Sequence, residues 1–115
     1  MRPDRHRARA EEIERSIDLL VAEDVAAHVA TIIEAAYGTA QQYLAYGMQQ
    51  QVGSHVDGHV GLIRALNGAG LTSVAALFDR LERLRTGHWY GAQGNGAAAR
   101  EALDVLAEVK RWSLS

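Results

Sequence analysis

The densest group of chemically capable side chains lies between Arg80 and Gly91. Guanidinium, imidazole, indole and phenol groups follow one another there, on Arg80, Arg83, Arg85, His88, Trp89 and Tyr90. Arginine binds phosphate oxygens bidentately, histidine transfers protons near neutral pH, and aromatic rings stack on bases. This segment therefore has the groups needed to hold an RNA phosphate and promote attack by the neighbouring 2′-hydroxyl, with no metal or other cofactor. Arg80, Arg85 and Trp89 would then contact the nucleic acid.

The same segment also fits a structural role. Asp79 and Arg83 lie four residues apart, and Glu82 and Arg85 lie three apart, which is the spacing of ion pairs on a solvated helix face. Cationic side chains also favour the C-terminal end of a helix, and the aromatic residues that follow can cover a core. Both interpretations stay open.

Length and composition predict one soluble domain. The chain has 115 residues, 48% of them hydrophobic and 23% charged, which excludes intrinsic disorder and leaves material for a single core. It has no cysteine, so disulfides, thiolate metal sites and cysteine nucleophiles are excluded. No apolar run is long enough to span a membrane, and the N-terminus lacks the apolar core of a signal peptide. We expect a cytoplasmic protein with no membrane partner.

Charge is distributed unevenly along the chain. Residues 1–10 carry +3, residues 11–47 carry −6 and residues 48–115 carry +1, which gives the net charge of −2. A nonspecific nucleic-acid binder normally presents a strongly basic face. Any site for a polyanion must therefore be local.

The hydrophobic pattern is helical throughout. Apolar residues recur every three or four positions over residues 10–22, 24–47, 72–86 and 97–112, although the first two segments could form one bent helix. Ser54 and Asp57 resemble a capping box that opens a further helix at residues 53–54, and this helix ends at the glycine turn of residues 67–70. Residues 87–96 are expected to form a glycine-rich loop. We predict an all-α, antiparallel four- to five-helix bundle over residues 10–115, preceded by a frayed basic arm at residues 1–9.

The order of these elements resembles the HEPN superfamily. These small α-bundles usually dimerise, and many are metal-independent ribonucleases with an Arg-x4-His motif. The segment from Arg83 to His88 has that spacing, and Tyr90 fits the extended Arg-x4-His-x-Tyr form. The resemblance implies that Arg83 binds the scissile phosphate, that His88 is the acid and base, and that Tyr90 supports the site near a dimer interface.

The chain departs from the family pattern in two ways. Leu84 stands where the family usually has a polar residue, often asparagine. A second register, from Arg85 to Tyr90 and Gly91, matches branches that lack the catalytic histidine. The sequence therefore leaves open whether Arg83 or Arg85 is the arginine of the family motif.

A second group of candidate residues is His55 and His59. Four residues apart on a predicted helix, they share a face and could bind a divalent metal together with His28 or Glu34. Their stripe continues into Leu62 and Leu66, so packed histidines with no metal are the main expectation.

Three functions follow from these features. The first is a HEPN-like endoribonuclease or RNA-binding protein that works as a homodimer, with Arg83 and His88 paired across the two-fold axis. The second is a noncatalytic dimeric helical module that binds a cognate protein partner. The third is a metal-binding bundle built on His55 and His59.

Overall fold

The computed structural model describes residues 2–56, 58–90 and 96–115, and of residues 88–90 it describes the backbone alone. Five α-helices occur in these ranges: α1 (Pro3–Glu23), α2 (Val29–Gly47), α3 (His59–Gly68), α4 (Thr72–Tyr90) and α5 (Ala97–Ser113). A short 3-10 turn, η1 (Val25–Ala27), precedes α2, and a π-helical turn, η2 (Met48–Val52), follows it. The described residues contain no strand, so the prediction of an all-helical protein is confirmed.

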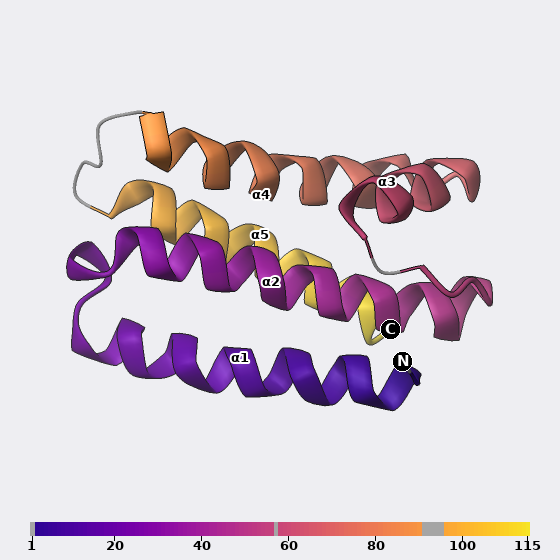
Figure 1. Ribbon diagram of the computed structural model, residues 1–115, viewed down its shortest axis with the longest axis horizontal. Coiled ribbons are helices and arrows are strands. Elements are labelled where there is room, and N and C mark those ends of the chain that lie inside the picture. The colour runs from indigo at the N-terminus through magenta and orange to yellow at the C-terminus, as the bar shows by residue number, and fades with distance from the viewer. Residues whose placement is uncertain (1, 57, 91–95) are drawn as a thin grey trace.

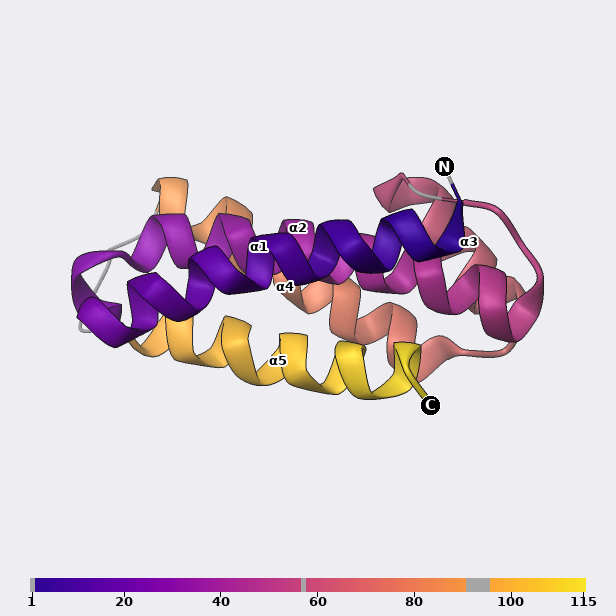
Figure 2. The same cartoon turned by 90° about the horizontal axis from the view of Figure 1, so that it is seen from below.

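The four long helices lie along the 39 Å length of the molecule, and short α3 sits at one end (Figure 1). The chain runs along α1, returns along α2, and after α3 runs back along α4 and returns along α5. Figure 2 shows that α1 and α5 lie on different sides of α2. Helix α2 is therefore the central element of the bundle.

The core follows from the helical period of α2. Its inward positions are fully buried, at Ile32, Ile33, Ala36, Ala40, Tyr43 and Leu44. The same cluster includes Leu62 and Leu66 of α3, Phe78 and Leu81 of α4, and Ala99, Ala102 and Val109 of α5. Residues three and four apart share one face of a helix, so α2 can bury such a stripe against several neighbours.

Helix α1 begins earlier than the sequence indicates. The segment predicted as a frayed basic arm is helical from Pro3, a residue whose fixed φ suits the first helical position. His6 is 2% exposed, and its Nδ1 atom lies 2.8 Å from Oε1 of Gln42 on α2. Because this contact and the buried Ala10 dock the first turns of α1, the basic segment is part of the bundle.

Helix α1 ends at Glu23, and Asp24 is not helical, so the alternative of one bent helix is wrong. Asp24 is extended, with φ of −175°, and its carboxylate accepts a hydrogen bond of 3.1 Å from the backbone N–H of Ala26. This side-chain cap starts η1, after which α2 runs back beside α1 (Figure 1).

The predicted start of the third helix is also wrong. Gly53, with φ of +82°, ends η2, and residues 53–56 have no helical structure. Helix α3 begins only at His59, and Asp57 of the predicted capping box lies outside the described residues. The predicted glycine turn does end α3, since Gly70 has φ of +78° and the N–H of Leu71 donates to the carbonyl of Leu66.

Helix α4 continues to Tyr90, beyond the predicted start of the glycine-rich loop at Gly87. The middle of that loop, residues 91–95, lies outside the described residues. Gly96, with φ of +91°, is the N-cap of α5, and a Cβ there would approach Cα of Ala26 to 3.3 Å. The start of α5 therefore packs closely on η1.

Candidate functional site

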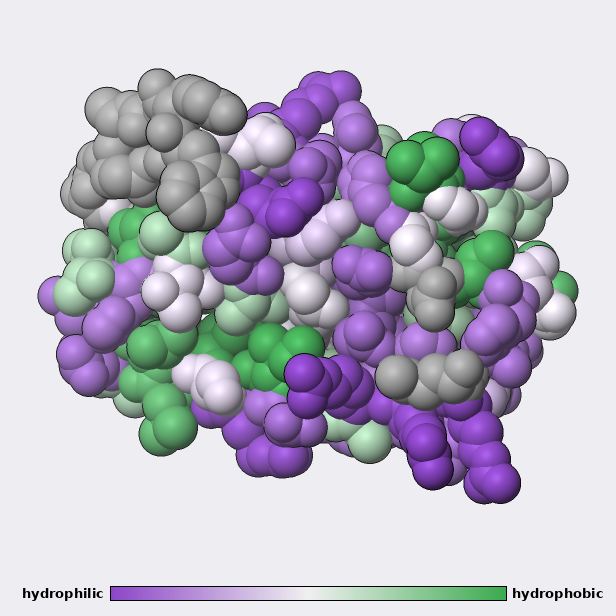
Figure 3. Space-filling model, viewed as in Figure 1, coloured by the Kyte–Doolittle hydropathy of each residue, from purple (hydrophilic) through white to green (hydrophobic). Residues whose placement is uncertain are grey.

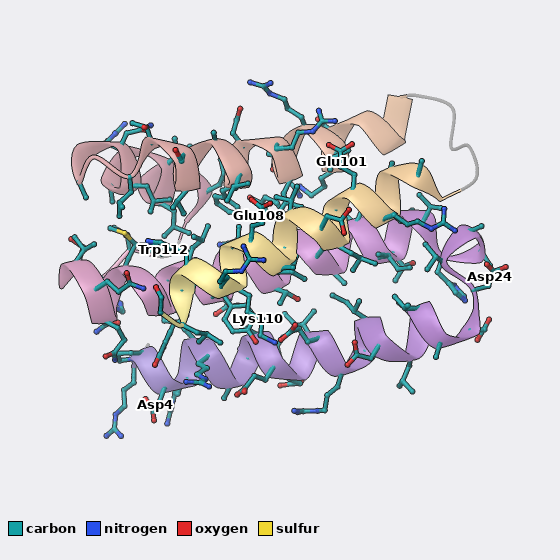
Figure 4. All side chains as sticks on the ribbon, turned by 180° about the vertical axis from the view of Figure 1, so that it is seen from behind. Asp4, Asp24, Glu101, Glu108, Lys110 and Trp112 are labelled. Carbon is teal, nitrogen blue, oxygen red and sulfur yellow. The ribbon has the colours of Figure 1, made fainter. Side chains whose placement is uncertain are left out.

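The three arginines of the predicted site all project from α4, and each meets a carboxylate. Nη2 of Arg83 lies 2.8 Å from Oδ2 of Asp79, one turn earlier. Nε of Arg80 donates to Glu101 of α5, a side chain labelled in Figure 4. This hydrogen bond lowers the pKa of the Glu101 carboxyl. The arginine cluster is thus neutralised to a large extent by its own chain.

Of the three arginines, Arg85 forms the most contacts with other side chains. Its Nε and Nη2 atoms donate to both carboxylate oxygens of Glu82, at 2.8–3.1 Å, and Nη1 lies 3.8 Å from Glu34 of α2. Its guanidinium carbon lies 4.2 Å from the centre of the Tyr37 ring. A bidentate carboxylate and an aromatic face are the partners that guanidinium matches best, so Arg85 joins α4 to α2.

Tyr37 lies at the centre of an aromatic group shared by three helices. Its ring stacks on that of Phe78, with centroids 5.1 Å apart and planes 13° apart. Its hydroxyl oxygen lies 3.0 Å from Nδ1 of His59, the first residue of α3. Tyr37 is 8% exposed, and burial, together with the nearby Glu82 carboxylate, raises its pKa to about 12. The hydroxyl therefore stays protonated well above neutral pH.

Arg83 differs from the other two arginines in its exposure. Its side chain is 71% exposed, and among the described residues it pairs with Asp79, itself partly exposed. An exposed pair of this kind contributes about 0–1 kcal/mol. A phosphate could therefore replace Asp79 at little cost.

Because α4 extends to Tyr90, Arg83 and His88 belong to the same helix, and helical geometry fixes their directions around its axis. A residue turns about 100° around a helix axis, so backbone positions five apart point about 140° away from each other. The backbone of α4 therefore puts positions 83 and 88 on different sides of one helix, whereas positions 83 and 90, seven apart, fall within about 20°. The side chains of His88, Trp89 and Tyr90 lie outside the description.

The described residues lack the geometry assumed for the alternative metal site. His55 belongs to the non-helical segment before α3, so it shares no helix face with His59. Nε2 of His28 lies 2.9 Å from Glu23, and Glu34 faces Arg85. In the described part of the chain, no three residues of the types that bind metals lie close enough to hold an ion.

A furrow between α3 and α4 was not predicted. One hollow of about 300 Å³ is lined by His59, Val60, Ile63, Arg64 and Asp79, and a second of about 370 Å³ continues from Ile63 and Asp79 toward Asn67 and Thr72. Val60 is 67% exposed beside it. Figure 3 shows apolar surface in the region of α3, next to strongly polar side chains. Spacing along the sequence gives no signal for a furrow whose walls come from two helices.

A second polar group that sequence analysis missed connects α1, α2 and α5. Tyr43 is fully buried and its hydroxyl donates to Glu14 of α1, while Nζ of Lys110 lies 3.2 Å from the same carboxylate. Figure 4 shows Lys110 on α5, on the side of α5 toward α1. Burial and the Glu14 carboxylate both raise the pKa of Tyr43. Because its members lie far apart in the sequence, only the fold reveals this group.

The chain matches no family model, no curated protein and no solved structure. None of the helices in the described ranges combines the length and the apolar character that crossing a membrane requires.

Proposed function

We propose that this chain is a HEPN-like helical protein that acts as a noncatalytic interaction module and forms a homodimer. The observation that carries this proposal is the position of Arg85, which is clamped on Glu82 and stacked over Tyr37. An arginine so engaged stabilises the contact between α4 and α2 and has few donors left for an RNA phosphate.

The order of the elements supports the HEPN-like part of the proposal. The long helix α2, the short α3, the glycine turn, the arginine-bearing α4 and the closing α5 follow in the order on which the resemblance rests, although α3 begins at His59 and not at the expected start near His55. The antiparallel course of the four long helices fits the expected bundle (Figure 1).

The furrow between α3 and α4 offers a surface for a second copy of the chain. Its α3 wall carries Arg64 and its α4 wall carries Asp79, so a two-fold axis along the furrow can bring opposite charges together. Exposed Val60 supplies apolar area beside these charges. Isologous interfaces need such self-complementary surfaces.

Sedimentation equilibrium of the whole chain at micromolar concentration tests this proposal. We expect a dimer that Val60→Asp weakens at least tenfold, because the substitution would bury a charge in the interface. Leu19→Asp is the matched control, since Leu19 is 74% exposed, against 67% for Val60, but lies on α1. A monomeric wild type, or equal weakening by both variants, would rule out this interface.

A metal-independent ribonuclease is the second candidate, favoured by the exposure of Arg83. In this function Arg83 holds the scissile phosphate, His88 moves the proton and Tyr90 supports the site. Because positions 83 and 88 diverge on one helix, Arg83 of one copy would work with His88 of the other. Arg80, Arg85 and Trp89 would contact the RNA.

An RNA cleavage assay separates the two candidates. A ribonuclease leaves 2′,3′-cyclic phosphate ends in the presence of EDTA and loses this activity in His88→Ala. The interaction module neither cleaves RNA nor binds it tightly at low salt. Cleavage that survives in His88→Ala removes His88 from the mechanism.

A further inference from the structure

Two histidines meet where the start of α1 lies beside the connection from η2 to α3. The rings of His6 and His55 have centroids 6.1 Å apart and planes 45° apart. Figure 2 shows the N-terminal end of α1 next to this connection. His6 is buried and His55 is exposed, so the pair can be reached from solvent on the side of His55.

Glutamines orient both rings in the same way. Nδ1 of His6 lies 2.8 Å from Oε1 of Gln42, and Nδ1 of His55 lies 3.1 Å from Oε1 of Gln49. An amide oxygen only accepts hydrogen bonds, so Nδ1 carries the proton in each neutral ring and Nε2 is the basic nitrogen. Histidines that bind metals almost always donate their other N–H to an oxygen in this manner.

The separation of the rings suits a shared ion. With metal–nitrogen bonds of about 2.0–2.1 Å, two imidazoles on one ion have centroids from about 4.5 Å apart, at a right angle, to about 6.4 Å apart, on opposite sides, so the observed 6.1 Å corresponds to a wide angle at the metal. We propose that His6 and His55 bind one transition-metal dication through their Nε2 atoms. Other contacts of His55 are no obstacle, since a coordinate bond can displace a hydrogen bond.

The ligand set defines the class of metal. Imidazole nitrogen suits Cu²⁺, Ni²⁺ and Zn²⁺, whereas Mg²⁺ and Ca²⁺ require oxygen. Copper should bind most tightly, in keeping with the general order of divalent affinities. Because the described residues offer no group of three or more ligands, water completes the coordination and the affinity is moderate. The bound ion would fasten the first turns of α1 to residues 53–56.

Isothermal titration of the untagged chain with Cu²⁺, Ni²⁺ and Zn²⁺ tests the site. We expect one ion per chain, with at least tenfold weaker binding in His55→Gln, an exposed position where folding is not at risk. Gln49→Ala should weaken binding by about tenfold, because the Nδ1 proton of His55 loses its acceptor. His28→Gln is the control, since His28 pairs with Glu23 near the opposite end of the bundle.

Copper electron paramagnetic resonance provides a second readout, in which two nitrogen couplings in the wild type become one in His55→Gln. Wild-type affinity in His55→Gln, or an equal loss in His28→Gln, would overturn the proposal. Dimerisation and RNA cleavage are measured without metal, so this result is independent of the proposed function.

Discussion

The guanidinium of Arg85 lies 4.2 Å from the centre of the Tyr37 ring, and this contact joins α4 to α2. Glu82 holds the guanidinium from one side, and the hydroxyl of Tyr37 reaches His59 of α3. An arginine that looks available for phosphate in the sequence thus takes part in the packing of three helices.

Arg85→Ala should lower the free energy of unfolding by about 1–3 kcal/mol, because it removes a cation–π contact and leaves Glu82 without its bidentate partner. Urea denaturation followed by circular dichroism measures the change. Arg83→Ala is the matched control and should cost less than about 1 kcal/mol, since its ion pair is exposed. Equal losses in the two variants would mean that Arg85 does not join the helices.

Gly47→Ala should destabilise the protein by about 1–3 kcal/mol. A Cβ at this position would lie 2.6 Å from Cζ3 of Trp112 and 3.0 Å from Cα of Ser113, so α5 must move away from α2. Gly87→Ala should instead stabilise the protein by about 0.5–1 kcal/mol, because that helical position has no atom within 4 Å of an added Cβ. Thermal melts of both variants check the contrast in sign.

Stability should fall as the pH rises from about 10 to about 12. The pKa of Tyr37 is raised to about 12 from an ordinary value of 10.0, so in this window the unfolded chain loses a proton that the folded chain keeps. The stabilisation is complete below pH 10 and is lost as the pH passes through 12. Urea unfolding across this range measures the slope, which Tyr37→Phe should reduce. Part of the slope should remain in Tyr37→Phe, because the pKa of Tyr43 is also raised.

Glu14→Ala should cost about 1–3 kcal/mol, because the fully buried hydroxyl of Tyr43 loses its acceptor. Lys110→Ala should cost less than about 1 kcal/mol, since its ammonium is partly exposed. Unfolding of Glu14→Ala in the background of Tyr43→Phe is the decisive measurement. The cost of Glu14→Ala should shrink there, and an unchanged cost would show that the hydroxyl and the carboxylate act independently.

Periodicity predicts the bodies of the helices but not their ends. The apolar stripes of α2 and α5 reflect burial on one face, and the glycine turn at Gly70 reflects a left-handed conformation that glycine adopts without strain. In contrast, α1 starts at Pro3 because His6 docks on Gln42, a contact that spans 36 residues. Similarly, α3 starts at His59 and not at the apparent capping box, since Tyr37 and Phe78 hold the histidine ring.

In the candidate site too, the sequence predicts contacts within one helix but not contacts between helices. The pairs Asp79–Arg83 and Glu82–Arg85 are local and follow from helical spacing, and both are present. The partners that decide the role of Arg85 are Glu34 and Tyr37, which lie on another helix. Local spacing carries no information about them, so the sequence leaves both phosphate binding and internal packing open.

The central position of α2 has a consequence for dynamics. Its two flanks are covered by α1 and α5, and α4 covers part of the remainder (Figure 2). The amide protons of α2 can exchange with solvent only when several neighbours separate at once. We therefore expect the slowest hydrogen exchange in the middle of α2, at a rate set by global unfolding, and faster exchange in α3, which can detach while the long helices stay together.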